Sequence, residues 1–294
     1  MGRNISISLL FRFLATVMLM GLITSASGQT LPAPSPTPPA RTKPSLERDF
    51  FRNIIRDQKA IWAAPVQLER SDTKWLVPSA IGAMALFTTD RITGDEIAEF
   101  DRGVPASRFI SQPGSIYGVG AVSATFYLIG RQTNNLKARE TGILSAEAAI
   151  DGLIVSSALK LGTQRARPDA LRERSEFFDG GSSFPSGHSV QAWAVATVIA
   201  SEYHDQRKVQ LAAYGIASAV SIARFTGGKH YISDVVIGSL LGYGIGKYVY
   251  RTHHQKEADS VDTEERITTS AWPEIAPRYN RGLRQYGVAL TWSF

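Results

Sequence analysis

Charged residues divide the apolar sequence of this 294-residue chain into runs that are mostly too short to cross a membrane. A membrane-spanning helix needs about 20 mainly apolar residues, whereas most runs here extend for about 12 to 15 residues between charges. The run 109–130 is the exception, and Gln112, Pro113 and several glycines interrupt it. Short apolar runs fit helices that bury one face in a protein core. The sequence therefore predicts an all-α fold, a helical bundle, and disfavours a multi-span membrane protein.

The spacing of apolar residues predicts where these helices lie. An amphipathic helix is expected from Ser45 onward, where apolar residues recur at near-helical spacing. Further helices are expected over 136–161, 187–203, 207–223 and 232–250. In the long helix 136–161, three acidic side chains are expected to face solvent or a functional site: Glu140, Glu147 and Asp151.

The first 28 residues have the three parts of a secretory signal peptide. Arg3 and Arg12 form a basic start, an apolar run covers 14–23, and Ala26-Ser27-Gly28 offers a small-residue cleavage site. An uncleaved N-terminal anchor helix is the alternative. Residues 29–44 follow as a proline-rich linker, which is expected to be extended or disordered. The chain is therefore expected to be exported, either to the periplasm or to a membrane surface.

Charge and cysteine usage exclude several functions. The formal net charge is +6 and falls to +4 without the two arginines of the first 28 residues, a surplus too mild to indicate nucleic-acid binding. No cysteine occurs anywhere in the sequence, which excludes thiolate catalysis and cysteine-ligated metal sites. An exported chain without disulfides must be held together by core packing.

The sequence changes character after residue 256. One helical domain is expected over 45–256, followed by a polar linker and a β tail in 257–294. Small or polar residues in this tail alternate with Tyr286, Val288, Leu290, Trp292 and Phe294. Alternation of period two is typical of a half-buried strand. A hairpin packed on the bundle is favoured over part of a membrane barrel, because one or two strands cannot close a barrel.

Three short motifs between residues 160 and 234 suit phosphate chemistry. The first is Lys160, six residues, then Arg167 and Pro168. The fork of an arginine meets two phosphate oxygens, and a lysine adds a point charge. The two cations are seven residues apart and share one face if the helix persists, and Pro168 is expected to help end that helix. Taken alone, the pair has the ordinary interpretation of a solvated helix face.

The second motif, Pro185-Ser186-Gly187-His188, precedes an apolar helical run. Ser186 is placed to cap this helix, and Gly187 allows close approach of the backbone to a ligand. The N–H groups at the start of a helix attract anions. Taken alone, the motif is equally compatible with an ordinary Ser-Gly helix start and an exposed histidine.

The third motif is Arg224, five residues, His230, three residues, and Asp234. His230 and Asp234 are four residues apart and share one face of the helix expected after Gly227-Gly228. A carboxylate bonded to one ring nitrogen fixes the tautomer of a histidine and makes the other nitrogen more nucleophilic. Arg224 is close enough in sequence to reach the same anion. Taken alone, His230 and Asp234 could form a merely structural pair.

Together, these three motifs resemble the three-part signature of the type 2 phosphatidic acid phosphatase (PAP2) superfamily. That superfamily contains bacterial class A acid phosphatases, lipid phosphatases and vanadium haloperoxidases. The resemblance covers about residues 150–240, in the order and with the internal spacings of the family. Ala223 departs from it, because serine is common at that position, and one hydroxyl contact is lost. The resemblance implies a helical bundle of the PAP2/haloperoxidase type with the site at one end of its core helices.

The resemblance also implies a role for each matching residue. His230 would attack phosphorus and form a phosphohistidine, with Asp234 orienting it. His188 would protonate the leaving group and then activate water. The phosphoryl oxygens would be bound by Lys160, Arg167, Ser186, Gly187 and Arg224. No metal or other cofactor is required, and vanadate is expected to bind as a phosphate mimic.

The expected activity is hydrolysis of phosphate monoesters or diphosphates, either small or lipid-linked. A vanadate-dependent haloperoxidase is the alternative enzyme, and a non-catalytic anion-binding protein is the alternative outside catalysis. The presence of both histidines and Asp234 argues against the latter, because binding needs only the cations. The expected partners are a small-molecule or lipid phosphate and, for a lipid, a membrane surface. No sequence feature indicates an oligomeric state.

Other residues near the motifs have ordinary interpretations. Arg165, Arg172 and Arg174 are interpreted as surface charge rather than as residues that attract substrate. The segment 179–181 is interpreted as a flexible loop before the second motif. Three further histidines at polar helix ends are expected to be solvated: His204, His253 and His254.

Overall fold

The computed structural model describes residues 46–66, 78, 81–90, 105–168, 176–268, 274–280 and 285–291. The predicted signal peptide (1–28) and linker (29–44) lie outside the described residues, as do Arg172 and Arg174. A helix covers 81–90. The other elements are α2 (Leu46–Ala63), η1 (Ala64–Val66), α4 (Pro105–Ser111), η2 (Gln112–Gly114), α5 (Ile116–Gln132), α6 (Leu136–Thr163), α7 (Gly187–Glu202), α8 (Arg207–Thr226), α9 (Ile232–Thr268), β1 (Glu274–Asn280) and β2 (Gln285–Thr291).

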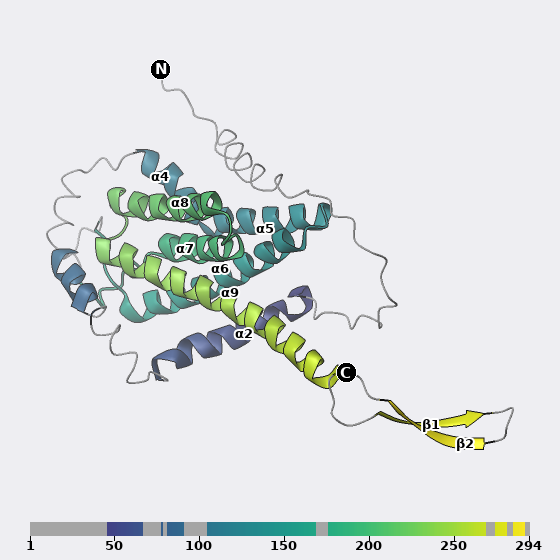
Figure 1. Ribbon diagram of the computed structural model, residues 1–294. Coiled ribbons are helices and arrows are strands. Elements are labelled where there is room, and N and C mark those ends of the chain that lie inside the picture. Colours follow the sequence, from purple (N-terminus) through teal and green to yellow (C-terminus); the bar gives the residue numbers. More distant parts are fainter. Residues whose placement is uncertain are drawn as a thin grey trace.

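Helix α7 lies at the centre of the bundle. It packs against α6, α8 and α9, and α5 packs along α6 (Figure 1). Helix α9 approaches α7 so closely that a Cβ atom at Gly242 would lie 2.3 Å from the carbonyl oxygen of Val190. The aliphatic core between α6, α7 and α9 consists of Leu144, Ala148, Val155, Val190, Ala194, Val198, Ile245 and Val249. The predicted all-α bundle is confirmed.

Several helix bounds agree closely with the sequence prediction, and one differs. Helix α7 covers Gly187–Glu202 and α8 covers Arg207–Thr226, against predictions of 187–203 and 207–223. Helix α9 continues to Thr268, through residues where a linker was predicted after 256. The stretch 257–268 is polar, but it contains neither glycine nor proline, so nothing in it forces the helix to end.

The uncharged run 109–130 is not one helix. Helix α4 ends at Ser111, η2 follows, and α5 begins at Ile116 with Ser115 as its N-cap, whose hydroxyl accepts a hydrogen bond from the backbone of Gly118 (3.1 Å). Among the described helices, α6 is the one that is long and apolar enough to cross a membrane. The core helix of a soluble bundle meets the same criterion, and most of α6 is packed against its neighbours.

The C-terminal residues form a two-stranded antiparallel hairpin. Strands β1 and β2 pair with Tyr279 opposite Tyr286. Figure 1 shows the hairpin beyond the C-terminal end of α9, whereas the sequence predicts a hairpin packed on the bundle.

Two acidic residues of α6 face α2 rather than solvent or the site, which corrects the prediction for them. Glu147 is 2% exposed and Asp151 is fully buried, and Gln58 of α2 donates a hydrogen bond to Asp151 Oδ1 (2.8 Å). Burial raises the pKa of Glu147 to about 9, and the adjacent Asp57 carboxyl group adds to this effect. Burial also raises the pKa of Asp151 to about 7. Glu147 therefore carries a proton at neutral pH inside the interface between α2 and α6.

Replacing Glu147 by glutamine is expected to reduce the pH dependence of stability. The pKa of Glu147 in the folded protein lies above its ordinary value of 4.5. The contribution of Glu147 to stability is therefore fully present below pH 4.5 and is lost as the pH rises through about 9. Between about pH 6 and pH 8 the free energy of unfolding should fall by up to about 1.4 kcal/mol per pH unit for this group. Glu147→Gln should remove this slope in urea titrations.

The control for this experiment is Asp205→Asn, which removes a carboxyl group that is 59% exposed. This variant should keep the slope of the unaltered protein. An equal slope in Glu147→Gln and in the unaltered protein would contradict the assignment of a buried protonated carboxyl group.

Candidate active site

The first motif spans the end of α6. Lys160 lies in the last turn of the helix, and the next residues leave the helical path because Gln164 adopts a left-handed conformation (φ 43°). Arg167 therefore lies beyond the helix, and the two cations do not share a helix face as predicted. Pro168 comes too late in the chain to end α6. The turn at Gln164 redirects the backbone and sets where Arg167 lies.

The loop 178–183 is hydrogen-bonded along this turn and is not a free loop. The backbone N–H groups of Phe178, Asp179, Gly181 and Ser183 donate to carbonyl oxygens of residues 163–165 at 2.9–3.1 Å. A Cβ atom at Gly181 would lie 2.1 Å from the carbonyl oxygen of Arg165, so only glycine allows this approach. The loop thereby brings Ser183 and the second motif beside the first.

The two cations of the first motif bind this loop. Lys160 Nζ donates hydrogen bonds to the carbonyl oxygens of Ser182 (2.7 Å) and Pro185 (2.6 Å). Arg167 Nη2 donates to the hydroxyl of Ser182 (3.2 Å). Both cations are half-buried. Lys160 and Arg167 are therefore held at the start of the second motif.

The second motif opens α7, as predicted. Ser186 occupies the N-cap position, but within the described chain its side chain makes no capping hydrogen bond; its hydroxyl accepts one from Ser189 (3.1 Å) instead. Ser186 is fully buried, whereas Gly187 and His188 are half-buried. The backbone N–H of Ser186 donates to the carbonyl oxygen of Asp234 (3.0 Å). This bond joins the second motif to the third.

His230 lies just before α9 and is 2% exposed. Its Nδ1 lies 2.8 Å from the carbonyl oxygen of Ser183. A carbonyl oxygen can only accept a hydrogen bond, so Nδ1 must carry the proton and Nε2 must be the unprotonated nitrogen of the neutral ring. The structure therefore assigns the tautomer in which Nε2 can act as a nucleophile.

Asp234 is connected to His230 only indirectly, through Ser183. Its Oδ2 is 3.8 Å from His230 Nδ1, beyond hydrogen-bond distance. Asp234 Oδ2 instead accepts hydrogen bonds from the hydroxyl of Ser183 (2.5 Å) and the backbone N–H of Tyr231 (3.0 Å). Burial alone would raise the pKa of Asp234, but the positive charge and hydrogen bonds around it hold that pKa below its usual value. The carboxylate is ionised and positions Ser183, which in turn binds His230.

Arg165 is not a surface charge, which corrects its interpretation from the sequence. Arg165 is fully buried, and its guanidinium binds Asp234 Oδ1 (2.6 Å) and Asp90 Oδ2 (2.7 Å). Ser183 is a second residue of the site that lies outside the three motifs, and it contributes both a carbonyl oxygen to His230 and a hydroxyl to Asp234. One sequence feature could have indicated that Arg165 belongs to the site: it lies two residues before Arg167, inside the first motif.

Burial and neighbouring positive charges shift the pKa values of three residues of the site. Burial, followed by the charges of Arg224 and the other cations, lowers the pKa of His188 to about 4. Burial lowers the pKa of His230 to about 4, although Asp234 opposes this. Burial and the charge of Arg167 lower the pKa of Lys160 to about 8. The predicted cations and histidines therefore lie within electrostatic range of one another.

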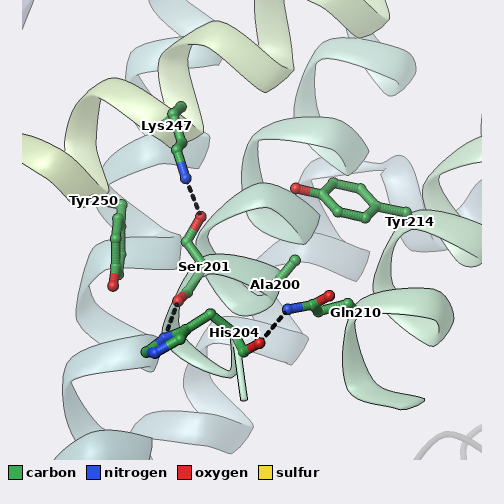
Figure 2. A pocket seen from close by; sticks show the side chains of 7 residues that line it. All are labelled: Ala200, Ser201, His204, Gln210, Tyr214, Lys247 and Tyr250. Carbon is green, nitrogen blue, oxygen red and sulfur yellow. Dashed lines mark hydrogen bonds between the residues drawn. The ribbon is translucent and has the colours of Figure 1, made fainter. Parts of the chain in front are cut away.

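A separate cavity of about 380 Å³ lies at the other end of α7 (Figure 2). Helix α7 has 16 residues, so the two ends are about 24 Å apart. None of the predicted site residues lines this cavity; the described residues that do are Ala200, Ser201, His204, Gln210, Tyr214, Lys247 and Tyr250. The three motifs meet at the N-terminal end of α7 instead.

Comparison with known proteins supports the resemblance that the motifs carry. The family model of the PAP2 superfamily matches residues 142–258. A lipid A 1-phosphatase of Porphyromonas gingivalis is 31% identical over 104 residues, which cover 35% of this chain and 21% of that protein. A PA-phosphatase related-family protein of Dictyostelium discoideum is 26% identical over 143 residues, which cover 42% of this chain and 52% of that protein.

The matches to these curated relatives therefore span only about a fifth and about half of their lengths. Among solved structures, a transmembrane PAP2 type phosphatidylglycerolphosphate phosphatase of Bacillus subtilis aligns with a TM-score of 0.45 and 20% identity. That alignment covers 71% of this chain and 96% of the other. Residues 142–258, which contain all three motifs, match the family model of the PAP2 superfamily.

Proposed function

We propose that this protein is a phosphatase that hydrolyses phosphate monoesters or diphosphates through a phosphohistidine on His230. The observation that carries the proposal is the hydrogen bond from His230 Nδ1 to the carbonyl oxygen of Ser183 (2.8 Å). It leaves Nε2 as the unprotonated nitrogen beside the charges of Lys160 and Arg224. A nucleophile held in one tautomer within a group of cations suits attack on a phosphoryl group.

The reaction has two steps. Nε2 of His230 forms a bond to phosphorus while the bond from phosphorus to the leaving oxygen breaks, and His188 donates a proton to that oxygen. His188 then removes a proton from water, which attacks phosphorus and releases phosphate from His230. The charges of Lys160, Arg167 and Arg224 stabilise the phosphoryl oxygens throughout. No metal or other cofactor takes part in these steps.

The low pKa of His188 in the unliganded site fits this role. Burial is the largest cause of that low pKa and three cations add to it, so a phosphate dianion would offset the part that is due to their charge. Substrate binding should therefore raise the pKa of His188 and supply the proton that the leaving group needs. A neutral His188 before binding also avoids adding a further positive charge to the empty site.

We further propose that the substrate is a lipid phosphate reached at a membrane surface. Two exposed apolar side chains near the end of α6 form an apolar rim: Leu161 follows Lys160 and is 75% exposed, and Phe178, 78% exposed, lies in the loop that is hydrogen-bonded to Thr163. Such a rim suits acyl chains or the bilayer boundary. The name of the lipid A 1-phosphatase relative agrees with a lipid phosphate substrate, and the N-terminal sequence agrees with export to the periplasm or a membrane.

The activity is tested with the purified full chain in EDTA. Hydrolysis of p-nitrophenyl phosphate, inhibited by vanadate, is the expected result. Peroxide-dependent halide oxidation after vanadate loading, without phosphatase activity, would identify a haloperoxidase instead. Phosphate binding without turnover would identify an anion-binding protein, and activity that EDTA abolishes would overturn the metal-independent mechanism.

The lipid preference is tested by Leu161→Ser. We expect kcat/KM for phosphatidate in mixed micelles to fall by about tenfold, because one exposed leucine contributes on the order of 1–2 kcal/mol to apolar contact. The value for p-nitrophenyl phosphate should fall much less. Leu211→Ser is the matched control, since Leu211 is 66% exposed at the opposite end of α8 from Arg224. Equal losses on both substrates would contradict a lipid-facing rim.

A further inference from the structure

A buried arginine lies beneath the candidate nucleophile. Arg165 Nη1 donates hydrogen bonds to Asp234 Oδ1 (2.6 Å) and to the hydroxyl of Ser233 (2.7 Å). Its Nη2 donates to Asp90 Oδ2 (2.7 Å). Arg165, Asp90 and Asp234 are all fully buried. One guanidinium thus joins a carboxylate of the site to a carboxylate from the helix 81–90.

Aromatic rings surround this guanidinium. Its central carbon lies 4.4 Å from the ring centre of Tyr231, 4.9 Å from that of Phe177 and 5.1 Å from that of Phe87. These distances are typical of cation–π contacts. A charge in such an apolar setting costs several kcal/mol unless it is paired, and a hydrophobic side chain of similar volume often replaces a buried ion pair without loss of stability. Fold stability alone therefore gives little reason for an arginine here.

The contacts of Arg165 lead directly to His230. Asp234 uses Oδ1 for Arg165 and Oδ2 for the hydroxyl of Ser183 (2.5 Å), and the carbonyl oxygen of Ser183 binds His230 Nδ1 (2.8 Å). A second connection is made by the backbone, because the N–H of Ser183 donates to the carbonyl oxygen of Arg165 (2.9 Å). Arg165 thus contacts both residues that determine where the His230 ring lies.

Asp90 anchors the same assembly from outside the matched family region. It accepts hydrogen bonds from the hydroxyl of Ser233 and from the backbone N–H of Ser233 (3.2 Å), at the start of α9. Carboxylates are stabilising at the first turn of a helix, where N–H groups lack partners within the helix. Asp90 therefore holds both Arg165 and the first turn of α9.

We propose that Arg165, anchored by Asp90, is a positioning residue that keeps Asp234 ionised and holds His230 through Ser183 in the tautomer with Nε2 unprotonated. This inference rests on the proposed phosphatase function. Arg165 touches no reacting atom and acts only through Asp234 and Ser183. The assembly explains why the carboxylate of the third motif can act on His230 from a distance of 3.8 Å.

The charges that face Asp234 come from several elements. Arg165 lies after α6, Lys160 in its last turn, and His230 before α9. Asp90 is the other carboxylate bound to Arg165. Removing the charge of Arg165 leaves Asp234 beside Asp90 without the cation between them, so the pKa of Asp234 should rise. A protonated Asp234 no longer accepts the Ser183 hydroxyl in the same way, and activity should then be lost at low pH.

The test compares Arg165→Met, Arg165→Lys and Ser183→Ala in the full chain. Arg165→Met should lower kcat for p-nitrophenyl phosphate by about 10- to 100-fold. This loss is typical when a residue that orients a functional side chain is replaced. KM should change much less, and the acid limb of the pH profile should move upward. Arg165→Lys should restore part of kcat. Arg207→Met is the matched control, because Arg207 is exposed at the start of α8 and should leave kcat and pH profile unchanged.

Ser183→Ala keeps the inference testable if Arg165→Met fails to fold, because it removes only the hydroxyl that joins Asp234 to Ser183. It should lower kcat, and its effect should be less than additive with that of Asp90→Asn, as expected for residues in one network. Full kcat and an unchanged pH profile in folded Arg165→Met, or in Ser183→Ala, would overturn the inference.

A spectroscopic measurement separates this inference from the proposed function. The chain has five histidines, so NMR of protein isotope-labelled at histidine can report the tautomer of His230, assigned by His230→Ala. The unaltered protein should show Nδ1 protonated and Nε2 unprotonated, and Arg165→Met should show a mixture of tautomers. This result would support positioning even in a protein without phosphatase activity. An unchanged single tautomer in Arg165→Met would contradict the inference whatever the activity.

Discussion

Replacing His230 by alanine should lower kcat for p-nitrophenyl phosphate by at least about 10⁴-fold, as removal of a nucleophile does in enzymes that form covalent intermediates. The reason is that Nε2 of His230 is the atom that the structure leaves unprotonated within the group of cations. No other side chain of the site combines a fixed neutral tautomer with this position. Steady-state kinetics in EDTA give the loss, and circular dichroism checks the fold.

His204→Ala is the matched control for this prediction. His204 is exposed and lines the cavity at the far end of α7, so its loss should leave kcat unchanged. Binding of inorganic phosphate should persist in His230→Ala, because the cations remain. A folded His230→Ala protein with turnover within about tenfold of the unaltered protein would disprove the nucleophile assignment.

Replacing His188 by asparagine should produce losses that depend on the leaving group. General acid catalysis contributes about 10²- to 10⁴-fold, and a poor leaving group needs it most. We therefore expect kcat/KM for glycerol 3-phosphate to fall by about 10³-fold and that for p-nitrophenyl phosphate to fall far less. Measuring kcat/KM over a series of phosphate esters with leaving groups of different pKa gives this dependence directly.

The same variant should accumulate the covalent intermediate. His188 also removes a proton from water in the second step, so its absence slows release of phosphate from His230. A burst of p-nitrophenol followed by slow turnover is the expected time course. Equal losses for all leaving groups without a burst would show that His188 does not transfer protons and only helps to bind the phosphate.

Much of the fold could be predicted because local sequence determines it. The apolar runs between charges gave the positions of α7 and α8 almost to the residue, since those helices begin near a Ser-Gly turn and after a polar turn at 203–206. The three motifs could be assigned to one site because fixed spacings carry chemical meaning. In the structure they do meet at the N-terminal end of α7.

The rest depends on contacts between distant parts of the chain. Arg165 looks like surface charge until Asp90, 75 residues earlier, is placed against it. Glu147 and Asp151 look solvated until α2 covers them. Ser183 binds His230 through its backbone carbonyl oxygen and Asp234 through its hydroxyl, and both contacts are with residues about 50 positions later in the chain. The Asp234–Ser183–His230 arrangement likewise needs the loop 178–183 to fold onto the end of α6.

Covalent attachment of the phosphoryl group to His230 is tested most directly by locating that group during turnover. The full-length His188→Asn protein is mixed with radiolabelled p-nitrophenyl phosphate in EDTA, quenched in alkali and digested, and the labelled peptide is sequenced. A phosphohistidine at His230 predicts an alkali-stable, acid-labile label on the peptide that contains His230, and no label in the double variant that also carries His230→Ala. A label on another residue, or a burst without any labelled peptide, would contradict a phosphohistidine at His230.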